Sequence, residues 1–447
     1  MQDISHIFRS YDIRGIYGKD LDEEIMKRIG NAFSRFTKSA VVSRDMRQSS
    51  PSLHSSFLEG FTEAGGNALD TDILPLGVAI FFAWQQKKEL AYITASHLGK
   101  EWNGAKFFHS SGLGFLEKEN YKLRDLVIKD KYSKARKKGK AKTDDSKKII
   151  SDYINFLAKK IKASKKLRVA MDFGNGAASL VGAELFKKCG FDIIPVFEDL
   201  DGTFPNRNPE PQEDELNVLK RMISECDLGI AYDGDGDRML LIDSSGRKLS
   251  AEQTSYLILS ELLKKEKGPI VANVECTRLV DYIANKFGRK VVRIPVGHTF
   301  LINETRKHKA CFGLEVAGHY TIPSILPFDD AMLISLYAAY SLSKQEEPLQ
   351  EIISELPEYF FERISISCDD KKKFLVIEKL KKSLKKKYKN VLTIDGVRIE
   401  LPNGWVLIRA SNTSPLIRLT VEAGTHGDLE KLKDEFLSLL EDEMSKV

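Results

Sequence analysis

The chain has 447 residues, which is too long for one hydrophobic core, so we expect three or four domains. Its apolar fraction of 42% and its charged fraction of 30% are typical of a soluble globular protein. The net charge of +5 is small for this length and gives no electrostatic reason to expect binding to nucleic acid.

The sequence also argues against secretion and membrane insertion. Residues 1–15 carry charges where a signal peptide would have its apolar core. The longest apolar run, residues 73–84, contains Pro75 and Gly77 and is too short to span a bilayer. The 5 cysteines form no CxxC pair, which indicates reduced thiols that mostly fill the core. We therefore expect a cytoplasmic protein with no membrane partner.

The first segment, residues 1–143, alternates predicted strands and helices. The pattern predicts a helix over 21–36 and strands over 40–43 and 90–93. A lysine-rich run over 129–148 indicates a domain boundary. Its only aromatic residue is Tyr132, so a solvated connector is favoured over a nucleic-acid surface, which needs several stacking side chains.

The second and third segments, 144–246 and 247–357, repeat this alternation. We expect helices over 149–162, 252–265, 278–286 and 330–343, and strands over 167–172, 228–231, 239–242, 269–274 and 290–294. The glycine-rich turn at 174–178 suits either a phosphate at a helix N-terminus or a tight strand-to-helix connection, and we favour the connection. Three such segments of similar length predict three related α/β units.

The last segment, 358–447, has an α+β pattern. Strands are expected over 361–367, 391–394, 397–400, 405–408 and 416–421, with helices over 373–388 and 428–444. In the first of these helices, Phe374, Ile377, Leu380 and Leu384 have the spacing of one apolar face.

Three aspartates alternate with glycines between two apolar runs. Asp233, Asp235 and Asp237 share one side of an extended chain, and the glycines let the backbone curl so that the carboxylates converge. Converging carboxylates need a cation, and hard oxygen ligands suit Mg²⁺ or Ca²⁺. Arg238 adds a donor for an anion beside that metal. The alternative is a polar β-turn with solvated aspartates.

Three further stretches carry polar groups that are suited to catalysis or to binding a phosphate or a sugar. Ser96, in Thr94-Ala95-Ser96-His97 with Lys106 downstream, is either a phosphoryl carrier or part of an ordinary turn. The loop 409–415 offers donors for a phosphate, or is a turn rich in serine and asparagine. Glu315 and His319, four residues apart, suit sugar hydroxyls or proton transfer, or form a polar turn.

Together these stretches match one family. Five motifs follow one another along the chain: Phe8-Arg9-Ser10-Tyr11-Asp12-Ile13-Arg14-Gly15; Thr94-Ala95-Ser96-His97 with Asn103-Gly104-Ala105-Lys106; Asp233-Gly234-Asp235-Gly236-Asp237-Arg238; Gly313-Leu314-Glu315-Val316-Ala317-Gly318-His319; and Arg409-Ala410-Ser411-Asn412-Thr413. The chain resembles the α-D-phosphohexomutases of the phosphomannomutase/phosphoglucomutase type over its whole length.

The resemblance implies an α/β fold with three related α/β domains and a C-terminal α+β domain around a central cleft. The domains would be residues 1–143, 144–246, 247–357 and 358–447. It implies a hexose phosphate substrate, a phosphoserine at Ser96, Mg²⁺, and glucose 1,6-bisphosphate or mannose 1,6-bisphosphate as activator. The implied site residues are Ser96, His97, Lys106, Arg14 and Arg238 for catalysis; Ser96, Asp233, Asp235 and Asp237 for metal; and Tyr11, His298, Glu315, Ala317, His319, Arg409, Ser411, Asn412 and Thr413 for substrate.

The chain departs from the family pattern in places. Leu98-Gly99 stands where the family often has Asn-Pro, Ala317 where serine is usual, and Glu275 where some bacterial members have lysine. Gly297-His298 and residues 327–331 favour mannose or glucose phosphate over glucosamine phosphate. The alternatives are a phosphoglucosamine mutase, a metal-dependent phosphatase and a non-catalytic sugar-phosphate-binding protein. The oligomeric state is left open.

Overall fold

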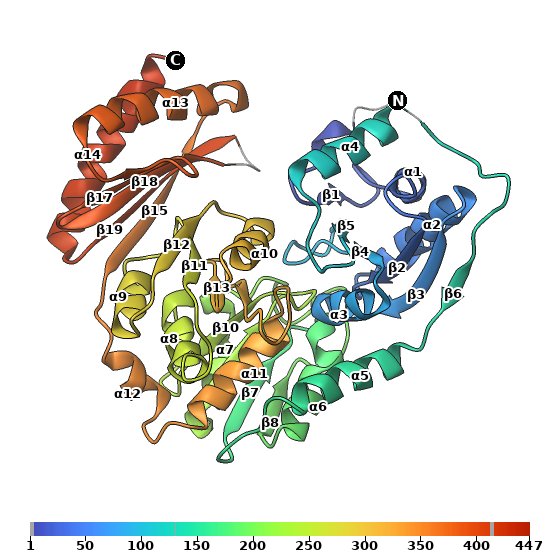
Figure 1. Cartoon of the computed structure of the whole chain (residues 1–447), viewed down its shortest axis with the longest axis horizontal. Helices are drawn as coiled ribbons and strands as arrows, with labels where there is room; N and C mark the ends of the chain where they lie inside the picture. The colour runs from blue at the N-terminus through green and yellow to red at the C-terminus, as the bar shows by residue number, and fades with distance from the viewer. Residues whose placement is uncertain (1–3, 130, 412–414) are drawn as a thin grey trace. The chain divides into compact units, whose positions relative to one another are not determined.

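The computed structural model describes residues 4–129, 131–411 and 415–447 (Figure 1). The chain divides into two compact units, which are described separately. Unit 1 comprises residues 1–265 and 317–353, and unit 2 comprises residues 266–316 and 354–447.

Unit 1 begins with a six-stranded sheet in the order β1-β5-β4-β2-β3-β6. Its strands are β1 (Ile13–Ile16), β2 (Ser39–Arg44), β3 (Asn67–Ile73), β4 (Glu89–Ile93), β5 (Trp102–Phe108) and β6 (Ala141–Thr143), and its helices are α1 (Glu23–Phe33), α2 (Ser50–Glu63), α3 (Leu76–Gln86) and α4 (Glu117–Ile128). β2 pairs in parallel with β3 and β4, while β5 runs antiparallel to β1 and β4. The carboxyl ends of β2 and β4 therefore lie at one edge, where open α/β sheets hold their functional residues.

Phenylalanine side chains form the core of this sheet. Phe33, Phe57, Phe107 and Phe115 are buried together, with ring centroids 4.9 to 6.2 Å apart between Phe33, Phe57 and Phe107. α1 and α2 can approach closely because Gly30 has no side chain: a Cβ there would collide with the carbonyl oxygen of Phe57.

The second sheet of unit 1 has the order β10-β9-β7-β8. Its part of the chain contains α5 (Ser146–Ala158), β7 (Arg168–Asp172), α6 (Gly182–Lys188), β8 (Asp192–Val196), α7 (Asn217–Met222), β9 (Leu228–Tyr232), β10 (Met239–Ile242) and α8 (Ala251–Leu262), and later β14 (Tyr320–Thr321), α11 (Ala331–Leu342) and α12 (Leu349–Ser354). β7 pairs in parallel with β8 and β9, and β9 and β10 form an antiparallel hairpin. The three aspartates occupy the connection of this hairpin.

Unit 2 contains three parallel strands in the order β12-β11-β13 and an antiparallel sheet in the order β15-β19-β18-β17-β16. Its elements are β11 (Ile270–Asn273), α9 (Leu279–Lys286), β12 (Val291–Ile294), α10 (His298–Lys307), β13 (Phe312–Leu314), β15 (Phe360–Ser367), α13 (Asp370–Lys387), β16 (Val391–Leu392), β17 (Val397–Leu401), β18 (Gly404–Ala410), β19 (Leu416–Ala423) and α14 (His426–Ser445). α13 and α14 pack on one face of the antiparallel sheet.

Most predicted elements are present, with ends shifted by a few residues. One expectation is wrong: Phe374 is 54% exposed, whereas Val376, Ile377, Leu380 and Leu384 form the buried face of α13. Residues 103–106, for which no strand was predicted, lie inside strand β5. Each of the 5 cysteines is a free thiol, as expected. Among the described residues, no helix is long and apolar enough to cross a membrane.

Candidate functional site

The aspartate loop converges as its spacing predicted. One carboxylate oxygen from each of Asp233, Asp235 and Asp237 lies within 4.8 Å of the other two. Oδ1 of Asp233 accepts hydrogen bonds from the backbone N–H groups of Gly236, Asp237 and Arg238 at 3.0, 3.0 and 3.1 Å. Gly236 has φ +75°, a conformation that glycine adopts without strain. The loop thus folds around one of its own carboxylates.

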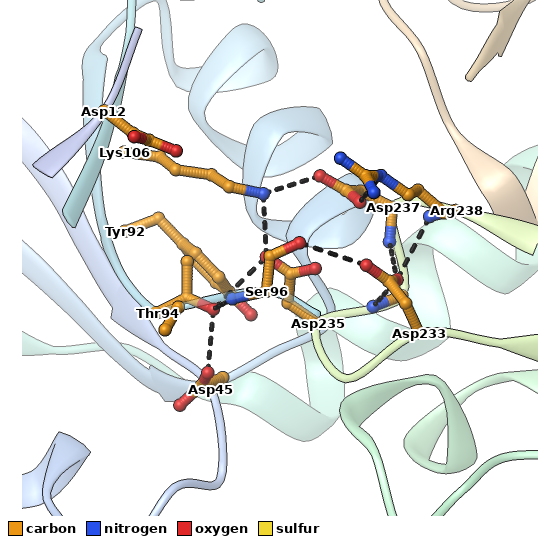
Figure 2. A network of polar contacts seen from close by, with 12 residues as sticks. Asp12, Asp45, Tyr92, Thr94, Ser96, Lys106, Asp233, Asp235, Asp237 and Arg238 are labelled. Carbon is orange, nitrogen blue, oxygen red and sulfur yellow. Dashed lines mark hydrogen bonds and ion pairs between the residues drawn. The ribbon is translucent and has the colours of Figure 1, made fainter. Parts of the chain in front are cut away.

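This carboxylate group fits a divalent cation. The Oδ1 atoms of Asp235 and Asp237 are buried and have no hydrogen-bond partner among the described residues. Burial, followed by the charges of Asp237 and Asp235, raises the pKa of Asp233 well above its usual range. The Lys106 ammonium contacts the group, 2.9 Å from Asp235 Oδ2 and 2.6 Å from Asp237 Oδ2 (Figure 2). The carboxylate oxygens that Lys106 does not contact are of the kind that Mg²⁺ prefers as ligands.

Ser96 lies against this loop although it comes from the other sheet of unit 1. Its Oγ donates a hydrogen bond to Asp233 Oδ2 at 3.0 Å (Figure 2). The residue follows β4 and has φ +53°, a left-handed conformation that is uncommon for serine. Its N–H donates to Thr94 Oγ1 at 2.8 Å. Such a conformation persists where the surrounding contacts impose it, often at functional sites.

A buried ion pair that sequence reasoning missed holds the Ser96 loop. Arg47 and Asp45 are both fully buried, and Arg47 Nε donates to Asp45 Oδ2 at 3.0 Å. The guanidinium also donates to four carbonyl oxygens, those of Ser96 (2.7 Å), Leu98 (2.6 Å), Gly99 (2.6 Å) and Trp102 (3.1 Å). Asp45 accepts a further bond from Thr94 Oγ1 at 2.7 Å. One signal was available: Asp45-Met46-Arg47 directly follows a strand, as Ser96 does.

Further cationic and imidazole groups surround Ser96. Arg14, on β1, donates from Nε to Asp12 at 2.8 Å and from a terminal nitrogen to the carbonyl oxygen of Ala95. Burial, and then the positive charges of Arg238 and Arg14, lowers the pKa of His97 to about 2. The imidazole of His97 is therefore neutral at physiological pH. Tyr11 is half-buried just before β1.

Arg238 and His319 are also brought together. Arg238 Nε lies 3.0 Å from His319 Nε2, and His319 Nδ1 lies 3.0 Å from Asp329 Oδ2. A guanidinium can only donate, so Nε2 accepts, and the imidazole proton is on Nδ1, facing Asp329. His319 and Asp329 are buried, whereas Ala317 is exposed.

The other predicted site residues belong to unit 2. Glu315 Oε1 accepts from the N–H of Gly297 at 2.7 Å, and His298 is the first residue of α10. Arg409, near the end of β18, donates from Nε to Glu275 Oε1 at 2.7 Å. Ser411, the first residue after β18, is buried. Asn412 and Thr413 lie outside the described residues.

Comparisons with known proteins cover all four segments. The chain matches phosphoglucomutase/phosphomannomutase alpha/beta/alpha domains I, II and III over residues 5–134, 151–246 and 250–360, and the C-terminal domain over 364–439. The phosphoglucosamine mutase of Methanocaldococcus jannaschii is 31% identical over 98% of this chain and 99% of that protein. The phosphomannomutase/phosphoglucomutase of Pseudomonas putida is 31% identical, over 97% and 95%.

A solved structure agrees with these matches. The crystal structure of a phosphoglucomutase/phosphomannomutase family protein from Burkholderia thailandensis has a TM-score of 0.90 and 26% identity, covering 99% of this chain and 98% of that one. The predicted fold class, with three α/β domains and a different C-terminal domain, is confirmed. The chain therefore belongs to the phosphoglucomutase/phosphomannomutase family of α-D-phosphohexomutases.

Proposed function

We propose that this mutase is a Mg²⁺-dependent phosphohexomutase that interconverts hexose 6-phosphates and hexose 1-phosphates through a phosphoserine at Ser96. The observation that carries this proposal is the 3.0 Å hydrogen bond from Ser96 Oγ to Asp233 Oδ2 within a buried group of three carboxylates and Lys106. A plain turn has no need of a serine in a left-handed conformation directed at a metal-type carboxylate group. The predicted segments 1–143, 144–246, 247–357 and 358–447 are proposed as the four functional domains.

The residues around Ser96 suit phosphoryl transfer. The phosphoryl group moves from Ser96 Oγ to a sugar hydroxyl, which breaks one P–O bond, forms another and gives a 1,6-bisphosphate. Bound to Asp233, Asp235, Asp237 and the phosphoserine, Mg²⁺ would offset the charge on the transferring group. Lys106, Arg14 and Arg238 add positive charge, and His97, next to Ser96, is assigned to charge stabilisation or proton transfer. Transfer of the other phosphate back to Ser96 completes the reaction.

Other residues are proposed to bind the sugar phosphate without reacting. The phosphate that is not being transferred needs an anchor that accepts either phosphate, and simple donors serve this purpose. We assign this anchor to Arg409, Ser411, Asn412 and Thr413. Contacts with the rest of the substrate are assigned to Tyr11, His298, Glu315, Ala317 and His319.

The candidate substrates differ in their sugar, which is mannose, glucose or glucosamine. Residues 297–298 and 327–331 favour mannose or glucose phosphate. The relatives named as a phosphoglucosamine mutase and as a phosphomannomutase/phosphoglucomutase are equally similar, at 31% identity each, so glucosamine phosphate is the second candidate. Glucose 1,6-bisphosphate or mannose 1,6-bisphosphate is the proposed activator. The cytoplasmic location also stays a prediction.

³¹P NMR of the purified protein tests the activity directly. The protein is incubated with Mg²⁺, a trace of glucose 1,6-bisphosphate, and mannose, glucose or glucosamine 1-phosphate in separate samples. We expect a 6-phosphate signal that is absent with Ser96→Ala, and the relative rates identify the sugar. Free phosphate would instead indicate a phosphatase. A well-folded protein without turnover would indicate a non-catalytic sugar-phosphate-binding protein.

A further inference from the structure

A buried carboxylate joins two arginines of unit 2 beside the end of β18. Glu275 Oε1 accepts from Arg409 Nε at 2.7 Å, and Glu275 Oε2 accepts from a terminal nitrogen of Arg363 at 3.0 Å. The side chains of Glu275 and Arg409 are 6% and 5% exposed, whereas that of Arg363 is 32% exposed. The bridge therefore has a buried end at Arg409 and a solvent-accessible end at Arg363.

The sheet register gathers positive charge around this bridge. Arg409 is directly opposite Arg418 on β19, and Arg418 is opposite Ser365, two residues along β15 from Arg363. The three arginines thus share one face of the sheet, where facing like charges repel. Burial lowers the pKa of Arg418, and the neighbouring Arg409 lowers it further. Glu275 and Asp395, 3.8 Å from Arg409, offset two of the three charges.

The position of Glu275 is fixed by its own loop. Asn273 Oδ1 accepts from the N–H groups of Glu275 and Cys276 at 3.2 and 3.1 Å. Arg398 donates to the carbonyl oxygens of Val274 and Cys276 at 2.7 and 2.8 Å. The backbone on both sides of Glu275 is therefore anchored, and the carboxylate is held where it meets the two arginines.

We infer that Arg363 is an additional phosphate-binding residue of this chain and that Glu275 positions it together with Arg409. The inference rests on the proposed function, because it takes Arg409 as an anchor of the phosphate that is not being transferred. A guanidinium has five N–H donors, so a contact with Glu275 leaves capacity for an anion. Through its contact with Glu275, Arg363 places a second guanidinium beside that of Arg409.

Equilibrium binding of glucose 1,6-bisphosphate to the full-length Ser96→Ala protein tests this assignment. KM and kcat are measured for the same Arg363 and Glu275 variants in protein that keeps Ser96. Arg363→Ala should weaken bisphosphate binding about tenfold and raise KM, with kcat within about twofold. Arg363→Lys should retain most of the affinity, because it keeps the positive charge. Lys433→Ala is the matched control: it removes a unit 2 cation that pairs with Glu362, also on β15, at 3.2 Å.

Two double variants separate a phosphate ligand from a simple counter-ion. Arg363→Ala with Glu275→Lys restores a cation beside Arg409 and should recover most of the lost affinity. Arg363→Ala with Glu275→Gln removes the unpaired carboxylate without adding a cation and should not recover it. Equal recovery in both would overturn the ligand role, because Arg363 would then only neutralise Glu275. Unchanged binding and KM in Arg363→Ala would also overturn it.

The binding measurement keeps this inference separate from the activity. If the protein with its original Ser96 turns over no sugar phosphate, the proposed function fails. The pattern of bisphosphate affinities among the variants still decides the role of Arg363. If turnover is normal and Arg363→Ala binds like the Lys433→Ala control, the proposed function stands and this inference fails. Melting temperatures of all variants identify any that do not fold. If Arg363→Ala is one of them, Arg363→Gln, which removes the charge but keeps a long polar side chain, serves as the test variant with the same expected loss of affinity.

Discussion

Arg238 Nε donates a hydrogen bond to His319 Nε2 at 3.0 Å, and this contact fixes the tautomer of the histidine. The proton on Nδ1 then faces Asp329 at 3.0 Å. Arg238 closes the aspartate loop, so the orientation of His319 is connected to the proposed metal-binding residues through a single guanidinium. Asp329 is buried and supports this arrangement from the far side of the imidazole.

Asp329→Asn should therefore lower kcat/KM for the preferred hexose phosphate by about tenfold or more, because an amide no longer favours the Nδ1–H tautomer by its charge. Steady-state kinetics measures the effect. Asp330→Asn is the matched control, since Asp330 is the next residue but accepts from Tyr153 at 2.8 Å instead. Equal kcat/KM values for the two variants would contradict a role for Asp329 in orienting His319.

Arg47→Lys should prevent phosphorylation of Ser96. Arg47 makes one contact with Asp45 and four with carbonyl oxygens of the Ser96 loop, and an ammonium with three donors cannot reproduce them. We expect a loss of more than about 100-fold in kcat. Mass spectrometry after incubation with glucose 1,6-bisphosphate measures the phosphoserine directly.

Arg44→Lys provides the comparison for Arg47→Lys. Arg44 is at the end of β2 and pairs with the exposed carboxylate of Asp72 at 2.6 Å. Its two contacts, with Asp72 and with the carbonyl oxygen of Asp45 at 3.1 Å, are within the capacity of an ammonium with three donors, so phosphorylation should be unchanged. If Arg47→Lys were phosphorylated as fully as Arg44→Lys, the Arg47 contacts would not be what places Ser96.

The difference between what was predicted and what was missed follows from sequence distance. The aspartate loop is local, so the alternation of Asp233, Asp235 and Asp237 was enough to predict that they converge. Arg47 and Asp329 act on residues 49 and 10 positions away, and only the folded chain brings these pairs together. The alignment of strands at one sheet edge was the only available indication.

One strand that was not predicted and one wrongly placed side chain also have physical causes. Residues 103–106 contain Asn103, Gly104 and Lys106 and have little strand propensity, and β5 forms because it pairs with both β1 and β4. Phe374 has helical spacing to Ile377, but α13 buries Lys373 instead, whose Nζ donates to the carbonyl oxygen of Ser411 at 2.6 Å. Local pattern does not include such long-range polar partners.

Asp235→Asn should weaken the response to Mg²⁺. Asp235 Oδ1 is buried without a hydrogen-bond partner among the described residues, so it is a candidate metal ligand, and an amide has no negative charge to offer. We expect the Mg²⁺ concentration for half-maximal activity to rise about tenfold or more, with a lower maximal rate. Chelation followed by titration with Mg²⁺ measures both. An unchanged titration curve would remove Asp235 from the metal site.

Asp330→Asn should change the pH dependence of thermal stability. Burial raises the pKa of Asp330 from 3.8 to about 6, although its contacts with Leu333 N–H and Tyr153 lower it. Because the folded-state pKa is raised, the contribution of Asp330 to stability is fully present below about pH 4 and is lost as the pH rises through 6. The loss amounts to about 3 kcal/mol at most.

An asparagine at position 330 does not ionise, and it can still accept from Leu333 N–H to cap α11. The melting temperature of Asp330→Asn relative to the original protein should therefore rise by a few degrees between pH 4.5 and pH 7.5. Differential scanning calorimetry at both pH values measures this difference. Asp329→Asn, changed one residue away, controls for the general effect of an amide in this loop. A difference that stays constant with pH would show that Asp330 titrates at its ordinary pKa.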